Sequence, residues 1–167
     1  MTYSLPLRDP PELVQDPRQC WSAAYESWTT ACSWIIRGAQ VVSEEEIEDQ
    51  LGGYPDAISE EGGATLAGVG LLQTVGSLQF EAVAGAELST ELLADRLRRF
   101  GYIYLIFWGR NRRGEVFSHA VVDSNARGGR MRVVDPGENR GLQTTATSYY
   151  RNALAMFIGT HIRAHEA

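Results

Sequence analysis

Cysteine is scarce in this chain: Cys20 and Cys32 are the only two in 167 residues. So few cysteines exclude the disulfide framework that holds small secreted domains together. The two fall on one predicted helix at a separation of ~18 Å along its axis. A disulfide requires Cα atoms within ~7 Å of each other. We therefore expect two free thiols and a reducing compartment.

Long hydrophobic runs are also missing. No apolar run approaches the ~18 residues that a membrane span requires. The first residues show neither the basic region nor the apolar region of a secretory signal. We expect no membrane span, no cleavable signal peptide and a cytoplasmic location in the producing cell. Delivery into a target cell by a specialised export system remains an alternative.

The chain has fewer basic than acidic residues and lacks the common cofactor-binding motifs. The net charge is −6, with 15 basic and 21 acidic residues. This balance argues against nucleic-acid binding, which needs a basic surface. The arginine clusters at 96–99, 110–113 and 127–132 are expected to be solvated. No Cys-x-x-Cys pair, phosphate loop or dinucleotide motif occurs, so we expect no metal and no cofactor.

What the chain does contain predicts a single α+β domain over residues 1–167. Residues 1–19 carry four prolines and read as an extended lead-in. Residues 20–76 should form a mainly helical lobe, and residues 77–167 a mainly β lobe. We expect the N-terminal helical lobe to pack on a C-terminal antiparallel sheet.

Local patterns place the elements within these two lobes. Apolar spacing from Cys20 predicts a helix that stops near Gly38, and Ser43 with Glu46 forms a capping box for a second helix. Two more helices are expected at 65–74 and 89–100, and strands at 77–84, 102–108, 116–123 and 130–134. The segment 149–162 is either a helix or, as we favour, a short helix followed by a strand such as 160–163.

Cys20 is the candidate nucleophile. It lies in the first turn of its helix, where unsatisfied N–H groups and the helix dipole stabilise a thiolate. Its backbone N–H could also donate to an oxyanion, and the upstream side-chain amide of Gln15, rather than that of Gln19, could supply a second donor. Trp21, beside the nucleophile, could line the substrate cleft. The alternative is a buried structural cysteine, the role that we expect for Cys32 on the apolar stripe.

His119 and Asp135 are the candidate base and orienting carboxylate. His119 is one of three histidines and is the first residue of the β-prone run 119–122, near the start of a predicted strand. Asp135 ends the next strand, so antiparallel pairing should bring the two side by side. Asp123 is a competitor, but it should lie ~13 Å from His119 along the strand. The alternatives are a strand histidine with a local hydrogen bond and an Asp-Pro that merely forms a turn.

These residues resemble those of compact bacterial papain-like cysteine proteases, such as avirulence-type effector proteases and the bacteriocin-leader peptidase domains of ABC exporters. The resemblance rests on Gln15, Cys20-Trp21, the run 119–122 and the run 134–136. It implies a two-lobed papain-like fold with Cys20 as nucleophile, His119 as base, Asp135 as orienting residue and Gln15 as oxyanion donor. Four features depart from the usual pattern: the Cys-Gly-Ser run is absent, the Cys-to-His spacing is shorter than the ~130–150 residues of the plant and lysosomal enzymes, Asp replaces their Asn, and Gln15 lies one position nearer the cysteine.

The sequence thus predicts a cysteine protease that acts on a protein or peptide through a thioester acyl-enzyme. We expect a toxin or effector domain with a narrow substrate range and an inhibitor or immunity protein as a second partner. An amidase or deamidase, a transglutaminase or an acyltransferase would use the same triad, since the residues do not fix the acceptor. A non-catalytic binding module on the same scaffold is the remaining alternative.

Overall fold

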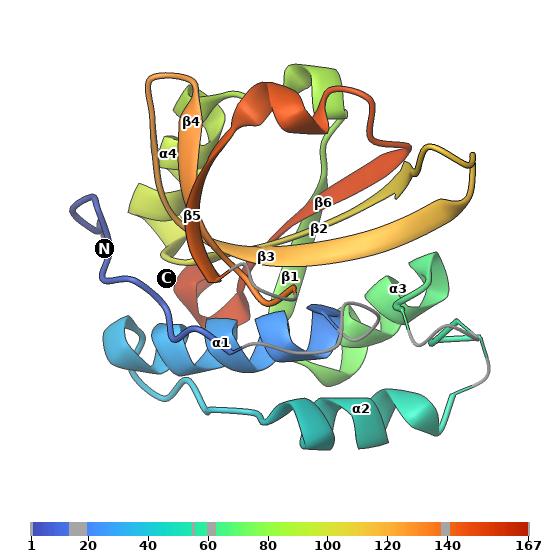
Figure 1. Cartoon of the computed structure of the whole chain (residues 1–167). Helices are drawn as coiled ribbons and strands as arrows, with labels where there is room; N and C mark the ends of the chain where they lie inside the picture. Colours follow the sequence, from blue (N-terminus) through green and yellow to red (C-terminus); the bar gives the residue numbers. More distant parts are fainter. Residues whose placement is uncertain (1, 14–19, 55, 60–62, 138–140, 167) are drawn as a thin grey trace.

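The computed structural model describes residues 2–13, 20–54, 56–59, 63–137 and 141–166 (Figure 1). Its α-helices are α1 (Cys20–Ile35), α2 (Glu44–Gly52), α3 (Leu66–Val75) and α4 (Thr90–Phe100). Its strands are β1 (Leu78–Ala82), β2 (Ile103–Arg110), β3 (Val116–Arg127), β4 (Arg130–Asp135), β5 (Gly141–Ala146) and β6 (Ala155–His161). Short 3-10 helices occupy Gly85–Glu87 (η2), Thr147–Tyr150 (η3) and Ile162–His165 (η4).

Six strands of the described residues form one antiparallel sheet in the order β1-β6-β2-β3-β4-β5. The sheet is strongly curved, with α1, α2 and α3 on one side and α4 on the other (Figure 1). Helix α1 contacts both β2 and β3. The α+β class with an N-terminal helical part on an antiparallel sheet is confirmed.

The helix boundaries follow the local signals. The Ser43 hydroxyl accepts from the Glu46 N–H at 3.1 Å, and the Glu46 side chain bonds back to the Ser43 backbone, so the predicted capping box is present. Gly101 closes α4 with a φ of +85°, a conformation that glycine adopts without the strain a Cβ would cause.

The C-terminal third differs from the prediction. Strand β5 was not expected, because its sequence GLQTTA has little hydrophobic alternation and it lies at the sheet edge. Strand β6 begins at Ala155 instead of Thr160 and lies inside the sheet, between β1 and β2. Gly159 interrupts the β-prone sequence of this strand, which makes the strand hard to predict. In the structure, a Cβ at this position would come within 2.6 Å of the Leu78 side chain. The glycine thus leaves room for the side chains of Leu78 and Phe80 on β1.

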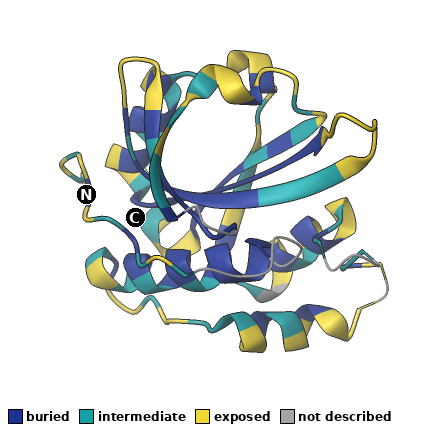
Figure 2. Ribbon diagram, viewed as in Figure 1, coloured by how far each residue is buried: buried dark blue, intermediate teal, exposed yellow. Residues whose placement is uncertain are grey.

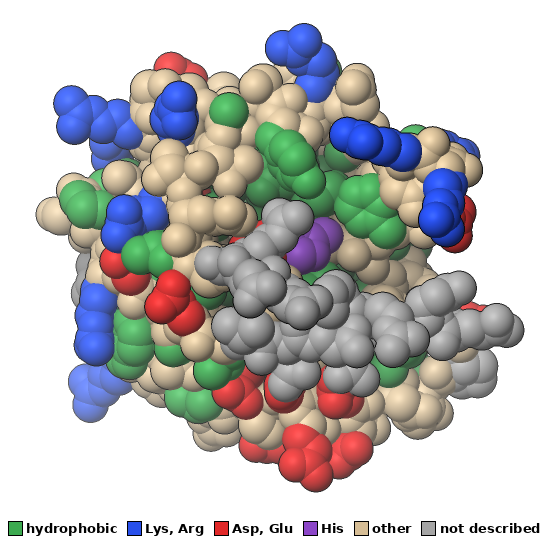
Figure 3. Space-filling model, viewed as in Figure 1, with side chains coloured by type: hydrophobic (Ala, Val, Ile, Leu, Met, Phe, Trp, Pro, Cys, Tyr) green, Lys and Arg blue, Asp and Glu red, His purple; other side chains and the backbone are tan. Residues whose placement is uncertain are grey.

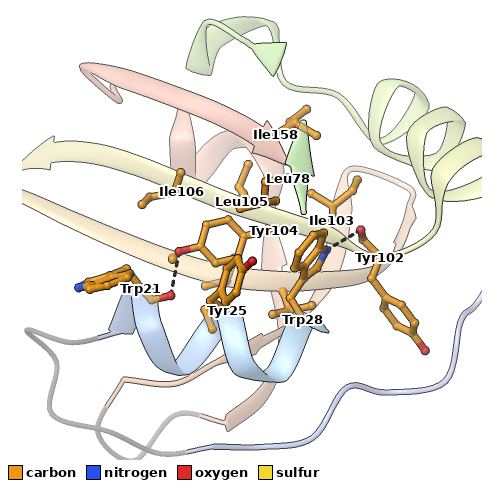
Figure 4. Close-up of a cluster of buried hydrophobic side chains, with 14 of the residues drawn as sticks. Trp21, Tyr25, Trp28, Leu78, Tyr102, Ile103, Tyr104, Leu105, Ile106 and Ile158 are labelled. Atoms are coloured by element: carbon orange, nitrogen blue, oxygen red, sulfur yellow. Dashed lines mark hydrogen bonds between the residues drawn. The ribbon is translucent and has the colours of Figure 1, made fainter. Parts of the chain in front are cut away.

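The core lies mainly between α1 and the sheet, where buried residues gather on the facing sides (Figure 2). Trp28 donates from its indole nitrogen to the Tyr102 carbonyl at 2.9 Å, and the Tyr104 hydroxyl donates to the Trp21 carbonyl at 2.8 Å (Figure 4). Cys32 is fully buried in this core, as its place on the apolar stripe predicts, and both cysteines are free thiols. The docking of α1 fixes where its first residue, Cys20, lies.

The described part of the lead-in packs along the sheet without joining it as a strand. Leu7 donates its N–H to the Ser124 carbonyl at 3.1 Å, and Asp9 forms a two-pronged ion pair with Arg132. The Glu12 carboxylate accepts the Leu142 N–H at the start of β5. Among the described residues, no helix has the length and hydrophobicity that a membrane crossing needs.

Candidate active site

Cys20 lies at the N-terminal end of α1, as predicted, but its side chain is more enclosed than a surface thiol. The residue is 2% exposed, and its sulfur lies 3.9 Å from the Ser118 carbonyl oxygen on β3. A 16-residue helix carries its positive dipole end and unsatisfied N–H groups here. Gln15 and Gln19, the candidate oxyanion donors, lie outside the described residues.

His119 is the fourth residue of β3, so it lies inside the strand rather than at its first position. The sheet register places it opposite Phe107 of β2. The two rings meet edge to face, with centroids 6.0 Å apart, and Phe107 in turn packs against Tyr150 at 5.0 Å. This aromatic packing fixes the plane of the imidazole.

Asp135, the last residue of β4, contacts His119 directly. Val122 pairs with Val134, which makes His119 and Asp135 diagonal neighbours on one face of the sheet. His119 Nε2 lies 2.7 Å from Asp135 Oδ1, and the aspartate side chain is only 3% exposed. The antiparallel pairing of neighbouring strands therefore brings these two side chains together, as the sequence predicts.

The environment of His119 strongly favours its protonated form. Burial lowers its pKa, but hydrogen bonds with Asp135 and Cys20, together with the negative charge of both partners, outweigh this and raise it to about 10. Because Nε2 faces Asp135, the other ring nitrogen is left for the thiol. With its pKa raised to about 10, the imidazole is an imidazolium at neutral pH.

Two further donors hold the Asp135 carboxylate. The Gly137 N–H donates to Oδ1 at 2.8 Å, and the Gln143 amide donates to Oδ2 at 3.1 Å. Gln143 was not a candidate from the sequence, because it lies on the edge strand β5, which the sequence pattern does not predict. Hydrogen bonds of this kind stabilise the charged carboxylate.

Asp123, the competing carboxylate, is engaged elsewhere. It is fully buried, and its Oδ1 accepts the Asn125 N–H at 3.2 Å. Burial raises the pKa of Asp123 well above its usual value, which disfavours the charged form that would stabilise an imidazolium. The structure therefore favours Asp135 over Asp123 as the partner of His119.

A cleft of about 1050 Å³ opens next to His119. Its walls come from the segment before and at the start of α3, from the β2–β3 hairpin and from η3. Three of its apolar side chains, those of Leu66, Val116 and Tyr149, are more than half exposed. Figure 3 shows a histidine side chain at the surface with hydrophobic side chains next to it. Such a cleft suits an extended peptide with apolar side chains.

Trp21 does not line this cleft. Its ring is 1% exposed and belongs to the core between α1 and the sheet (Figure 4). Successive helix residues point about 100° apart around the axis, so Trp21 can face the core although it follows Cys20. This placement leaves almost no ring surface for a substrate.

In the described part of the chain, no group of three or more His, Cys, Asp or Glu side chains could hold a metal ion.

Comparisons with known proteins agree with this geometry at the level of fold. No protein-family model matches the sequence, and no curated protein matches it significantly. The peptidase domain of Streptococcus ComA, a bi-functional ABC transporter involved in a quorum-sensing pathway, has a TM-score of 0.58 at 13% identity, covering 92% of this chain and 99% of that one. A double glycine motif protease from an AMS/PCAT transporter, solved with a leader peptide, has a TM-score of 0.58 at 14% identity, covering 96% and 97% respectively. The chain therefore has the papain-like fold of these peptidase domains.

Proposed function

We propose that this protein is a cysteine peptidase that uses Cys20, His119 and Asp135. The observation that carries the proposal is the His119 imidazole, whose Nε2 lies 2.7 Å from Asp135 Oδ1, next to Ser118, whose carbonyl oxygen lies 3.9 Å from the Cys20 sulfur. A thiol, an imidazole and a carboxylate in this order form the arrangement that activates a nucleophile and orients its base. The papain-like fold supports the same conclusion.

The reaction proceeds in two acyl-transfer steps. The Cys20 thiolate attacks the scissile carbonyl carbon, and the His119 imidazolium then gives its proton to the leaving amine as the C–N bond breaks. This step leaves a thioester on Cys20 and a neutral His119. The neutral imidazole takes a proton from water, which attacks the thioester and releases the carboxylic acid. The Cys20 N–H donates to the oxyanion, and Gln15 stays a predicted second donor.

The substrate we propose is a peptide with a glycine pair before the cleaved bond. Cys20 is 2% exposed, so its sulfur can be approached most readily by a carbonyl whose neighbours lack bulky side chains. The apolar cleft beside His119 would hold the hydrophobic residues of the same peptide. The AMS/PCAT protease that shares the fold is a double glycine motif protease and was solved with a leader peptide. We expect a narrow substrate range, which the enclosure of Cys20 supports.

The roles of toxin or effector and of an immunity protein as partner have no support from these structural neighbours. One neighbour is the peptidase domain of an ABC transporter, and the other is a protease from an AMS/PCAT transporter that was solved with a leader peptide. Processing of a peptide is therefore the function that we favour over an attack on proteins of another cell.

Synthetic peptides test this proposal. We expect cleavage after Gly-Gly in a peptide with apolar residues upstream, and a loss of about 100-fold or more when both glycines are replaced by valine, since an ill-positioned scissile bond reacts this much more slowly. Mass spectrometry of the products identifies the bond. Deamidated or amine-linked products without chain cleavage would instead establish one of the acyl-transfer alternatives, and equal cleavage of both peptides would exclude the glycine preference.

The raised pKa of His119 predicts the pH dependence of cleavage. The imidazolium must be present to protonate the leaving amine, so kcat/KM should fall at alkaline pH with a midpoint near pH 10. Asp135→Asn removes the negative charge that raises this pKa, so the alkaline limb should move to lower pH. Asp123→Asn, the same carboxyl-to-amide change on the strand of His119, serves as the control and should leave the limb in place, because Asp123 is engaged with the Asn125 N–H. An unchanged limb in Asp135→Asn would show that Asp135 does not stabilise the imidazolium.

A further inference from the structure

Building on the proposed function, we infer that Gln143 is a positioning residue that orients the Asp135 carboxylate toward His119. Gln143 does not touch the thiol, and the structure gives it no contact with the reacting atoms. Its side-chain amide donates to Asp135 Oδ2 at 3.1 Å, while Oδ1 accepts from His119 at 2.7 Å. The amide therefore acts on the reaction through Asp135.

The sheet register explains why this contact forms. Gln143 pairs with Val133 and is thus a diagonal neighbour of Asp135, just as Asp135 is a diagonal neighbour of His119. The three side chains share one face of the sheet and cross β3, β4 and β5 in a line. A pocket of about 350 Å³ lies along this line and is lined by all three. Gln143 is half-buried there, although β5 is an edge strand.

The carboxylate needs such a donor because its rotation is weakly restricted by its own bonds. The last side-chain torsion of aspartate is broad and roughly two-fold, in contrast to the staggered torsions of aliphatic chains. Donors on both oxygens fix this torsion: Gly137 and His119 bind Oδ1, and Gln143 binds Oδ2. With Oδ2 held, Oδ1 keeps the direction in which the imidazole meets it and the ring keeps its second nitrogen toward Cys20.

Strand β5 is itself fixed at the end that carries Gln143. The Glu12 carboxylate accepts the N–H of Leu142, the residue before Gln143, at 2.6 Å. The lead-in that contains Glu12 is tied to β4 through the Asp9–Arg132 ion pair. The amide of Gln143 is thus presented from a strand whose position is set by contacts on both sides.

The variant Gln143→Met tests this role, since methionine has nearly the length and shape of glutamine but no donor. We expect kcat for Gly-Gly peptide cleavage to fall roughly 10- to 100-fold with a smaller change in KM, the loss typical of a misoriented catalytic group. Thr145→Val removes a hydroxyl two residues along the same strand, beside the same pocket, and should retain full kcat. A Gln143→Met enzyme as active as Thr145→Val would overturn the inference.

Two further measurements separate positioning from other effects. In an Asp135→Ala background, Gln143→Met should cause little additional loss of kcat, because a residue that acts through Asp135 has nothing left to orient. A full additional loss would contradict the inference. By NMR, the pKa of the His119 ring should fall in Gln143→Met, since a misaligned carboxylate stabilises the imidazolium less. An unchanged pKa of His119 would indicate a purely structural role for Gln143, and a higher pKa would indicate a purely electrostatic one. Either result would contradict the inference.

The NMR titration tests the role of Gln143 independently of the proposed peptidase activity. It needs no substrate, so it reports on the Gln143–Asp135–His119 line even if the wild-type chain cleaves none of the peptides. Inactivity of the wild type against all peptides would refute the proposed peptidase but leave the titration result to decide the role of Gln143.

Discussion

Replacement of Cys20 by serine should abolish peptide cleavage while leaving the fold intact. We expect kcat/KM to fall by ~10⁴-fold or more, the scale seen when a catalytic nucleophile is removed. A serine hydroxyl does not ionise at neutral pH, so it cannot form the anion that pairs with the His119 imidazolium. Because serine nearly matches cysteine in size, the buried position at the start of α1 should accept it without a large loss of stability.

Cys32→Ser provides the matched control, since Cys32 is the other thiol of the same helix. It is fully buried in the core, and burial raises its pKa well above the usual value, so it is a neutral thiol. A hydroxyl there should lower the free energy of unfolding by about 1–3 kcal/mol, the cost of a poorly partnered polar group in an apolar site. Activity per folded molecule should be unchanged.

Urea unfolding and peptide cleavage, measured on both variants, separate a loss of activity from a loss of stability. Cys20→Ser loses activity and keeps stability, whereas Cys32→Ser does the reverse. Iodoacetamide labelling of the wild type near pH 6 adds a measure without substrate: Cys20 should react much faster than Cys32, and His119→Ala should slow it. Equal labelling of the two cysteines would contradict an activated Cys20.

The pairing of His119 with Asp135 could be predicted from sequence because it depends on neighbouring strands. β3 and β4 are joined by a short glycine turn, which makes them antiparallel neighbours. The exact alignment depends on a register shift between Asp123 and Asn125, which puts the side chains of His119 and Asp135 on one face and which the sequence does not predict. The position of Cys20 at a helix start could also be predicted from sequence, since the start of an amphipathic helix is a local property. The approach of the first residue of α1 to the Ser118–His119 part of β3 was expected only from the family resemblance and not from local sequence patterns, because this contact spans nearly a hundred positions.

The missed features share a physical cause, which is their dependence on distant partners. Gln143 lies on an edge strand whose residues show no strong β pattern, and its role appears only when β5 pairs with β4. The cleft walls at Leu66, Val116 and Tyr149 come from three separate segments. Trp21 looked like a cleft residue because it follows Cys20, yet the helix turns its ring into the core. Spatial neighbours, not sequence neighbours, decide these cases.

The same dependence on tertiary packing makes Trp28 the residue whose loss should most destabilise the protein. Its ring is fully buried, donates to the Tyr102 carbonyl at 2.9 Å and stacks on His161 at 5.5 Å (Figure 4). Tyr25 and Tyr104 also contact it. Trp28→Ala should lower the free energy of unfolding by about 3–5 kcal/mol, because it removes this burial and leaves a cavity.

Trp34→Ala is the control on the same helix. Trp34 is 37% exposed and contacts Arg8 and Tyr102 from the outside of the core, so its loss should cost only about 1 kcal/mol. Urea unfolding followed by circular dichroism measures both variants. Equal destabilisation would show that the Trp28 contacts do not hold α1 on the sheet. If they do, Trp28→Ala should also slow the labelling of Cys20 in molecules that remain folded, because the docking of α1 is what brings Cys20 to His119.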